Sequence, residues 1–291
     1  MRAALHTVAL AALAIPHGRA QTAEPAEPAF AKLQPELERA QAQWEKSPEA
    51  RAAQVDWTIT RGLVVQRRLA GANRFNGKRA VDVDLEHEEV VRFGIHDKFS
   101  ISAWILPAAP TGAIVVRGKD VAQGKGYGLC LQDGKVQLNL VYRWQDDALR
   151  VETEGAIGLN QWHNVTATYD GSGAAVGIRM YADGRLQKVK IHLDNLHDSF
   201  ETKEPLWIGG GGGPESRFRG QIRGVRIYNR VLTAGEAEVV ATETPVSTIA
   251  QTPAEKRTHG ESEKIRLYFL ERAAPPEIRE AWQRVVETRE K

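Results

Sequence analysis

Apolar and polar positions follow three successive patterns along the 291 residues of the chain. Residues 30–55 carry apolar side chains at spacings of three and four, which predicts a helical lead-in with a helix over residues 35–46. Residues 56–242 are short segments in which apolar and polar residues alternate, the period of a β-strand, with Gly, Asp and Asn between them. Residues 243–291 begin as a Thr/Pro/Ala-rich stretch and then return to the helical period. We therefore expect one β domain with helical extensions on both sides.

The β region contains two strong hairpin signals. Asp133-Gly134 and Asp183-Gly184 each stand between alternating runs, and Asp-Gly favours a type I′ turn because both central residues need positive φ. Many short strands without intervening helices predict an all-β fold, a two-sheet antiparallel jelly-roll sandwich with flanking N- and C-terminal helices. Trp104 and Trp207 lie inside strand-like runs with apolar neighbours, so we expect both in the core.

The flanks of the β domain predict linkers and further helices. Residues 21–29 and the stretch that begins at Glu243 are rich in Pro, Ala and Thr, a composition typical of linkers. Residues 262–272 and 277–290 have helical spacing. Thr233 and Glu236 have the spacing of a capping box, which predicts a short helix directly after the last strand.

Two of the predicted helices have faces that are too apolar for a free surface helix. Short helices are marginal in water without tertiary packing. We therefore expect the two faces to pack on each other or side by side on the sandwich, with docking on further domains as the alternative. The faces consist of Leu33, Leu37 and Trp44 near the N-terminus and of Ile278, Trp282 and Val285 near the C-terminus.

Residues 1–29 allow two interpretations. Arg2 precedes an apolar stretch from Ala3 to Ile15, and Gly18-Arg19-Ala20 supplies small residues, which together resemble a secretory signal. An Ala/Leu-rich helix from within a longer chain fits the same residues, because His6 interrupts the apolar stretch. The signal interpretation favours a periplasmic, cell-envelope or secreted location.

Composition narrows the function classes. The count of Lys and Arg is 39 against 37 for Asp and Glu, so the sequence does not favour a concentrated basic surface for nucleic acid. The chain lacks an apolar run of about 18 residues, and no membrane span is expected. Cys130 is the single cysteine, which excludes an intrachain disulfide and a cysteine-rich metal site. Its alternating surroundings predict a small buried side chain.

Four segments resemble the laminin-G-like jelly rolls of the concanavalin A-like lectin/glucanase superfamily. The resemblance spans roughly residues 56–241 and implies a domain that binds carbohydrate or protein ligands without catalysis. The segments are Phe75-Asn-Gly-Lys with Ala80-Val-Asp-Val, Phe99-Ser-Ile-Ser-Ala-Trp-Ile, the run from Gln161 to Asp170 leading to Met180-Tyr-Ala-Asp-Gly-Arg-Leu, and the run from Phe218 to Thr233.

The tail carries a narrower resemblance. Thr252-Pro-Ala-Glu-Lys-Arg-Thr and the later run from Ile265 to Pro275 are similar to the stretch after the lectin-like domain in large planctomycete-type multidomain proteins. Those proteins combine it with cytochrome-c-like and unknown-function domains. The resemblance implies neighbouring domains of a longer chain as partners.

Three residues depart from the calcium-binding members of the resembled family. Asn76 stands where the opening turn often has Asp, and Arg223 and Gly224 stand where the closing strand often has an acidic pair. Calcium prefers several oxygen ligands, anionic ones above all. We therefore expect no cofactor and no strong metal site, with a weak calcium site at Asn76 and backbone carbonyls as the alternative.

Lectin-like folds also include glycoside hydrolases, which need two carboxylic acids across the scissile bond. The run Glu86-His-Glu88-Glu89 and the pair Glu152 and Glu154 have strand spacing, but their surroundings predict solvated strand edges or loops. Gly209–Gly213 lacks the Lys-Ser/Thr of a phosphate-binding loop and predicts a flexible loop. His163 is expected to be structural.

The candidate ligand-binding residues are Tyr142, Trp144, Asp146 and Asp147. Aromatic faces stack on sugar rings and planar polar groups bond to sugar hydroxyls, so this composition suits a glycan. The alternative is that Trp144 packs a loop onto the sandwich.

The sequence thus predicts a non-catalytic recognition module for carbohydrate or protein ligands within a multidomain envelope or exported bacterial protein. A structural spacer remains open as an alternative, as does a glycoside hydrolase of the lectin-like fold. A concave groove lined by Tyr142 and Trp144 favours the first. A bare, charged concave face with the terminal helices packed together favours the second, and two carboxyls facing each other across a cleft favour the third.

Overall fold

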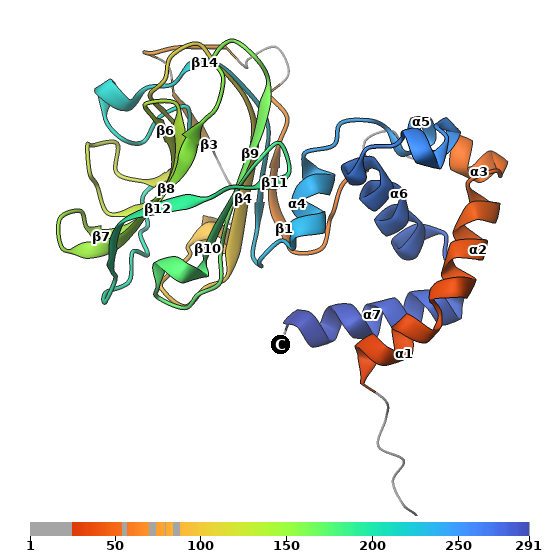
Figure 1. Cartoon of the computed structure of the whole chain (residues 1–291). Coiled ribbons are helices and arrows are strands. Elements are labelled where there is room, and N and C mark those ends of the chain that lie inside the picture. Colours follow the sequence, from red (N-terminus) through yellow and green to blue (C-terminus); the bar gives the residue numbers. More distant parts are fainter. Residues whose placement is uncertain (1–24, 54–56, 70–73, 79, 84–87, 291) are drawn as a thin grey trace, which may run out of the picture.

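Two antiparallel sheets of seven strands each pack face to face and form the larger lobe of the molecule (Figure 1). The computed structural model describes residues 25–53, 57–69, 74–78, 80–83 and 88–290. The N-terminal segment 1–24, the predicted domain start at Asp56 and the acid Glu86 lie outside the described residues. The predicted all-β sandwich with flanking helices is confirmed.

Sheet A has the strand order β1-β14-β4-β9-β10-β11, with β2 paired to β14. Trp104 in β4 is only half-buried and lies on the outer face, because alternate residues of this strand turn inward. The prediction that Trp104 is a core residue is therefore wrong. The strands are β1 (Leu63–Arg67), β2 (Arg74–Asn76), β4 (Phe99–Pro107), β9 (His163–Tyr169), β10 (Ile178–Ala182), β11 (Arg185–Leu186) and β14 (Arg219–Tyr228). The inward set of β4 is Phe99, Ile101, Ala103 and Ile105.

Sheet B has the strand order β12-β8-β7-β6-β5-β13-β3. Leu206 and Ile208 enter the core from β13, and Trp207 between them lies half-buried on the outer face. Its Nε1 donates to the carbonyl oxygen of Gly118 (3.1 Å), so the core prediction is wrong for Trp207 as well. The strands are β3 (Val81–Val83), β5 (Gly112–Gly118), β6 (Gly126–Gln132), β7 (Lys135–Arg143), β8 (Asp147–Ala156), β12 (Val189–Asn195) and β13 (Leu206–Ile208).

Both predicted Asp-Gly hairpins are present. Asp133-Gly134 joins β6 to β7 with φ of +52° and +77°, and Asp183-Gly184 joins β10 to β11 with φ of +52° and +78°. Positive φ at both central residues is the requirement that made Asp-Gly a hairpin signal.

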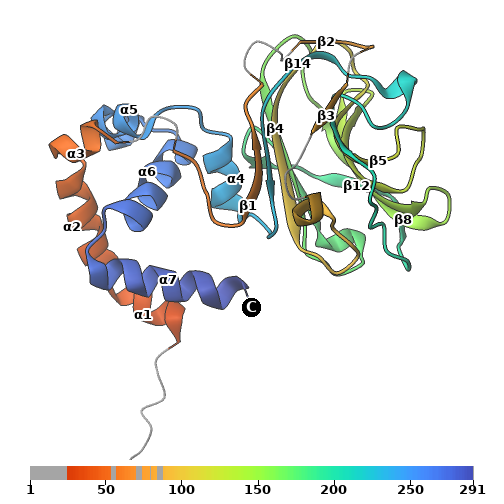
Figure 2. The same cartoon turned by 180° about the vertical axis from the view of Figure 1, so that it is seen from behind.

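A helical lobe lies against sheet A of the sandwich, with α4 at the junction, where it contacts β11, and with α1 running alongside α7 (Figures 1 and 2). Its helices in the described part are α1 (Ala26–Lys32), α2 (Gln34–Trp44), α3 (Pro48–Arg51), α4 (Ala234–Val240), α5 (Val246–Gln251), α6 (His259–Arg272) and α7 (Pro276–Glu290). Short 3-10 turns are η1 (Glu88–Val91), η2 (Ala175–Gly177), η3 (Pro214–Ser216) and η4 (Ala254–Lys256). None of the described helices is long and apolar enough to cross a membrane.

Helix α7 packs on α1, whereas the predicted N-terminal face on α2 meets α6 instead, where Trp44 contacts Tyr268 and Phe269. The rings of Phe30 in α1 and Trp282 in α7 lie 5.4 Å apart between centroids. Arg289 Nε donates to Glu27 Oε1 at 2.9 Å on the rim of the same contact. Together with Leu37, Ile278 and other buried side chains, these helices enclose a second apolar core that reaches Tyr228 of the sandwich.

Both predicted linkers are partly helical. Helix α1 begins at Ala26, inside the segment expected to be a linker. Helix α5 forms in the Thr/Pro/Ala-rich stretch because Val246 and Ile249, three residues apart, are both fully buried in the helical core. The composition of this stretch did not predict a helix, because the apolar side of α5 is buried only by contacts with α3 and α6, which are distant in the sequence or follow later.

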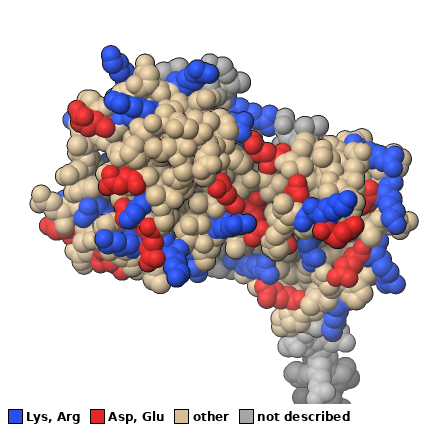
Figure 3. Space-filling model, turned by 45° about the horizontal axis from the view of Figure 1, so that its top comes forward, with Lys and Arg blue, Asp and Glu red and all other residues tan. Residues whose placement is uncertain are grey.

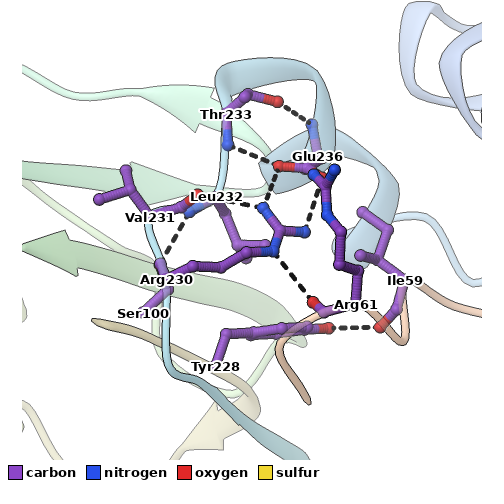
Figure 4. Close-up of polar contacts among 9 residues, drawn as sticks. All are labelled: Ile59, Arg61, Ser100, Tyr228, Arg230, Val231, Leu232, Thr233 and Glu236. Carbon is purple, nitrogen blue, oxygen red and sulfur yellow. Dashed lines mark hydrogen bonds and ion pairs between the residues drawn. The ribbon is translucent and has the colours of Figure 1, made fainter. Parts of the chain in front are cut away.

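A buried ion-pair cluster, the junction clamp of Arg61, Arg230 and Glu236, fastens α4 to the sandwich (Figure 4). Arg230 donates to the two Glu236 oxygens at 2.7 and 2.8 Å, and Arg61 donates to Glu236 Oε1 at 3.0 Å. Thr233 closes the predicted capping box with the same glutamate. Desolvation opposes ionisation of Glu236, but the hydrogen bonds and charge of Arg230 outweigh it and lower its pKa.

Candidate functional site

The outer face of sheet B carries a hollow of about 280 Å³, called here the sheet B groove. Its floor is the outward-facing set of β6 and β7, because the alternate residues of these strands, Leu129, Leu138 and Leu140 among them, turn into the core. Val116, Gly128 and Asn139 lie in one row across β5, β6 and β7, and Ala113, Cys130 and Gln137 lie in the next.

Glycines keep part of the floor of the sheet B groove free of side chains. A Cβ at Gly126, whose φ is +138°, would lie 1.9 Å from the carbonyl oxygen of Arg117. A Cβ at Gly128 would lie 3.0 Å from Val116 Cγ2, already a tight contact. The backbone itself therefore forms part of the surface, which is what a close approach by a ligand requires.

One wall of the groove combines the loop 119–125 with the glycine loop 209–213. Asp120 joins the two loops: its Oδ1 accepts from the amides of Gly211 (3.2 Å) and Gly213 (3.0 Å), and both its oxygens pair with Arg217. Partial desolvation opposes ionisation of Asp120, but these hydrogen bonds and the Arg217 charge lower its pKa. The glycine loop is thus held by a carboxylate, and the expectation of a flexible loop is corrected.

Trp144 forms the opposite wall, at the tip of the hairpin between β7 and β8. The guanidinium carbon of Arg150 lies 4.6 Å from the centre of the Trp144 ring, so one ring face is already covered. Among the four predicted ligand residues only Trp144 lines the groove.

The other three predicted residues shape the Trp144 hairpin. Tyr142 packs partly against the core, with Lys125 Nζ 4.7 Å from its ring centre. Asp146 is exposed and accepts from Arg143 Nε (2.9 Å). Asp147 is buried, and its Oδ1 accepts from the amides of His197 (2.8 Å) and Asp198 (3.3 Å). Desolvation opposes ionisation of Asp147, but the two amides and Arg143 lower its pKa.

Asn139 is the residue that sequence reasoning missed. Its side chain reaches the floor of the groove and the residue is only 8% exposed, yet its carboxamide makes no hydrogen bond within the described ranges. Arg150 lies opposite Asn139 across the β7–β8 pair, and its buried Nε is also without a partner. The Asn139 carboxamide is not sealed from solvent and lines the groove, so it offers a donor and an acceptor to a ligand there.

Glu152 lies in the neighbouring row and is fully engaged. It accepts from Gln137 Nε2 (2.6 Å), Lys135 Nζ (3.2 Å) and His192 Nε2 (3.3 Å). Desolvation opposes ionisation, but these three partners lower the pKa of Glu152. The expectation of a solvated strand edge is wrong for Glu152, which is 6% exposed, and holds for the exposed Glu154.

Cys130 also lines the groove and is half-buried, so it is not the core residue expected from its alternating neighbours. Desolvation raises the pKa of its thiol to about 12. A thiol in that state is a poor nucleophile at neutral pH and serves as part of the floor.

The residues considered for metal binding have other partners. Asn76 Oδ1 accepts from the amide of Lys78 (3.0 Å), and His163 Nδ1 bonds to Asp183 Oδ2 (2.8 Å). Within the part of the chain that the structure describes, no three His, Cys, Asp or Glu side chains gather as metal ligands. On the face seen in Figure 3, Lys and Arg are interspersed with Asp and Glu over both lobes.

Comparisons with solved structures found several similar chains. Among solved structures, the chain is similar to the CBM40 module of the Ruminococcus gnavus IT-sialidase, at 17% identity, with 62% of this chain and 100% of that chain covered and a TM-score of 0.48. The SAP-like pentraxin of Limulus polyphemus is 16% identical, with 58% of this chain and 80% of that chain covered and a TM-score of 0.43. The binding domain of botulinum neurotoxin serotype G is 16% identical, with 62% of this chain and 50% of that chain covered and a TM-score of 0.45.

No curated protein matches the sequence significantly. The family comparison is decisive, because the sequence profile described as the concanavalin A-like lectin/glucanases superfamily matches residues 80–238, more than half of the chain. That range runs from the residue before β3 into helix α4 and includes the groove in full. The chain therefore belongs to the concanavalin A-like lectin/glucanases superfamily.

Proposed function

We propose that the chain is a non-catalytic recognition module whose sheet B groove binds an uncharged sugar unit of a glycan. The observation that carries the proposal is the unpaired carboxamide of Asn139 at the floor of the groove. A carboxamide both donates and accepts, which matches a sugar hydroxyl, and Gln137 beside it on the groove lining is a second carboxamide. The groove volume of about 280 Å³ suits a single ring rather than a long chain segment.

The predicted ligand residues enter this proposal in two roles. The uncovered face of Trp144 stacks on the sugar ring. Tyr142, Asp146 and Asp147 hold the hairpin that positions Trp144, since Asp147 ties the hairpin base to the chain after β12. We further propose, from the signal-like N-terminal segment and the resemblance of the tail, that the module acts within a larger exported or cell-envelope protein.

Two alternatives differ in what they require of the molecule. A structural spacer is favoured by the packed terminal helices, whose contact of α1 with α7 closes the helical lobe. A glycoside hydrolase requires a carboxylic acid that keeps its proton near neutral pH. Glu152, the buried carboxylate beside the groove, has a lowered pKa and therefore does not supply that proton.

A glycan array followed by calorimetric titration of the best ligand tests the proposal on the full chain. We expect Asn139→Leu and Trp144→Ala each to weaken binding about tenfold, the size of one lost hydrogen bond or stacking contact. Leu186→Ala is the control, because it removes an exposed apolar side chain from β11 of the other sheet, away from both hollows. Absence of any glycan ligand, or equal loss in all three variants, would favour the spacer instead.

A further inference from the structure

A second hollow lies where the sandwich meets the helical lobe, and the proposed function does not use it. This junction cavity of about 420 Å³ is bounded by the outer face of sheet A, by α4 and by the segment before β1. It is lined by Trp57, Trp104, Arg223, Arg226 and Glu243, among others.

A β-bulge brings two arginines to the same face of β14. Arg223 pairs with Trp104 and Arg226 with Ser102 across β4, although the two arginines are three positions apart and would otherwise alternate. The extra residue is at Gly224, whose φ of +62° is the conformation that favours glycine. Ile222, Val225 and Ile227 meanwhile all reach the core. The bulge thus places both guanidinium groups on the side of the cavity.

Several donors that line the cavity have no acceptor. Arg226 Nε and Nη1, Arg223 Nε and Trp57 Nε1 are buried and make no hydrogen bond in the described part of the chain. Trp57 is 3% exposed, so bulk water does not reach it freely. Arginine and tryptophan side chains donate only, so what they lack is an acceptor, and a guanidinium favours an anionic one.

The charged residues that line the junction cavity also favour an anionic ligand. Arg68 and Lys264 also line the cavity, and Lys264 donates to the carbonyl oxygen of Thr242 (2.7 Å). Glu243 is the one carboxylate among the lining residues, and it is about half-exposed and bonded to Arg223 Nη2 (2.8 Å). Arg226 makes no salt bridge within the described residues; burial lowers the pKa of its guanidinium, and the nearby charge of Glu243 offsets only part of this.

The walls of the cavity are fixed before any ligand arrives. The junction clamp joins β14, α4 and the segment before β1, the elements that supply Arg226, Val239 and Trp57 (Figure 4). Arg223 is held as well, since its guanidinium carbon lies 4.0 Å from the centre of the Trp162 ring and 5.7 Å from that of Trp104. A preorganised set of donors loses little freedom when it binds.

We propose that the junction cavity is an oxyanion site, which takes a sulfate, phosphate or carboxylate group on Arg226, Arg223 and Trp57. The group arrives either as the free ion or on a sugar ring that lies against Trp104. The site is separate from the sheet B groove, because it is formed by the other sheet and by the helical lobe, and it requires a charge that the groove does not.

Calorimetric titration of the full chain with sodium sulfate, sodium phosphate, glucuronate and glucose, all at one ionic strength set with sodium chloride, tests this site. We expect saturable binding of at least one of the three anions and none of glucose. Tighter binding of glucuronate than of the inorganic ions identifies a sugar-borne carboxylate, and the reverse order identifies a free oxyanion.

Arg226→Met is the test variant, and Arg179→Gln, which changes an exposed arginine of β10 in the same sheet, is the control. We expect Arg226→Met to weaken anion binding at least tenfold and Arg179→Gln to leave it unchanged. Near-ultraviolet circular dichroism of Arg226→Met verifies that the fold is retained. Equal anion binding by wild type and Arg226→Met, or no anion binding by the folded wild type, overturns the proposal.

Discussion

The outer faces of the two sheets use the same structural device for different chemistry. On sheet B, Arg150 lies 4.6 Å from the centre of the Trp144 ring, and on sheet A, Arg223 lies 4.0 Å from the centre of the Trp162 ring. Near the first pair lie the Asn139 carboxamide and the Glu152 carboxylate, which is already hydrogen-bonded. Near the second pair lies Arg226, which makes no salt bridge with any described residue. An arginine stacked on a tryptophan therefore does not define the charge of a ligand, and the surrounding hydrogen-bonding groups do.

The two faces also differ in what holds their walls. Loops form the walls of the sheet B groove, and the Asp120 carboxylate and the base of the β7–β8 hairpin fix them. A helix forms a wall of the junction cavity, and the clamp of Arg230 and Glu236 fixes it. The cavity should thus depend on the attachment of the helical lobe, and the groove should not.

Breaking the clamp gives the largest effect that we expect. Arg230→Ala leaves Glu236 buried with a single arginine partner, and removal of one member of a buried ion pair typically destabilises a protein by about 3–5 kcal/mol. Urea denaturation should show a loss of that order, and anion binding at the junction cavity should disappear while glycan binding at the groove persists.

The control for this experiment is Arg289→Ala, which removes an exposed ion pair to Glu27 in the same lobe. We expect it to change the free energy of unfolding by less than about 1 kcal/mol. Similar losses in the two variants would show that the clamp does not hold the junction.

The clamp also predicts a pH dependence. The pKa of Glu236 is lowered from 4.5 in the folded protein, so its contribution is fully present above the unfolded pKa and is lost as the pH falls through the folded value. We expect Glu236→Gln to be less stable than wild type at pH 7, and the difference to shrink as the pH falls below about 4.5. Chemical denaturation at pH 7, 5, 4 and 3 measures it. A difference that stays constant over this range would contradict the assignment.

A smaller effect concerns the buried donors themselves. Arg226→Met removes a desolvated cation that has no salt bridge to a described residue, and Asn139→Leu removes an unpaired carboxamide, so neither leaves a hydrogen-bond partner behind. We expect both variants to unfold with a free energy equal to that of wild type or up to about 1 kcal/mol higher. A loss of more than 1 kcal/mol in the free energy of unfolding of either variant would mean that its polar group is structural. The two faces would then differ in whether their polar groups stabilise the fold.

Sequence periodicity predicted the sandwich and both hairpins because these depend on local rules: alternation, and positive φ at Asp-Gly. It was wrong for Trp104 and Trp207, because alternation defines two faces of a strand without saying which one meets the other sheet. Asn139 looked like an ordinary outward residue between Leu138 and Leu140. It lines the groove together with Trp144, which ends the same hairpin, and with the loop 119–125, which lies before β6 in the sequence.

The same limit applies to the junction cavity. Arg223 and Gly224 were noted only as residues that stand where acids are common in the resembled family. Their role in forming the cavity depends on the bulge, which places Arg226 on the same face as Arg223, and on α4, which follows the last strand and forms a wall. Of the four candidate ligand residues Trp144 lines the groove, and its role in binding stays a prediction.

Cys130 offers the smallest and most local measurement that distinguishes the two faces. Its thiol lines the sheet B groove, and desolvation raises its pKa to about 12, so at pH 8 only roughly one molecule in ten thousand carries a thiolate. We expect alkylation by iodoacetamide to be slow in the native protein and fast in urea. A glycan bound in the groove should slow the native reaction about threefold or more, because it covers the floor beside Asn139 and Gln137. Sulfate or glucuronate at the junction cavity should leave the rate unchanged, since that cavity lies on the other sheet. Protection by the anions that equals protection by the glycan would show that both ligands occupy the groove, and the distinction between the two faces would then be wrong.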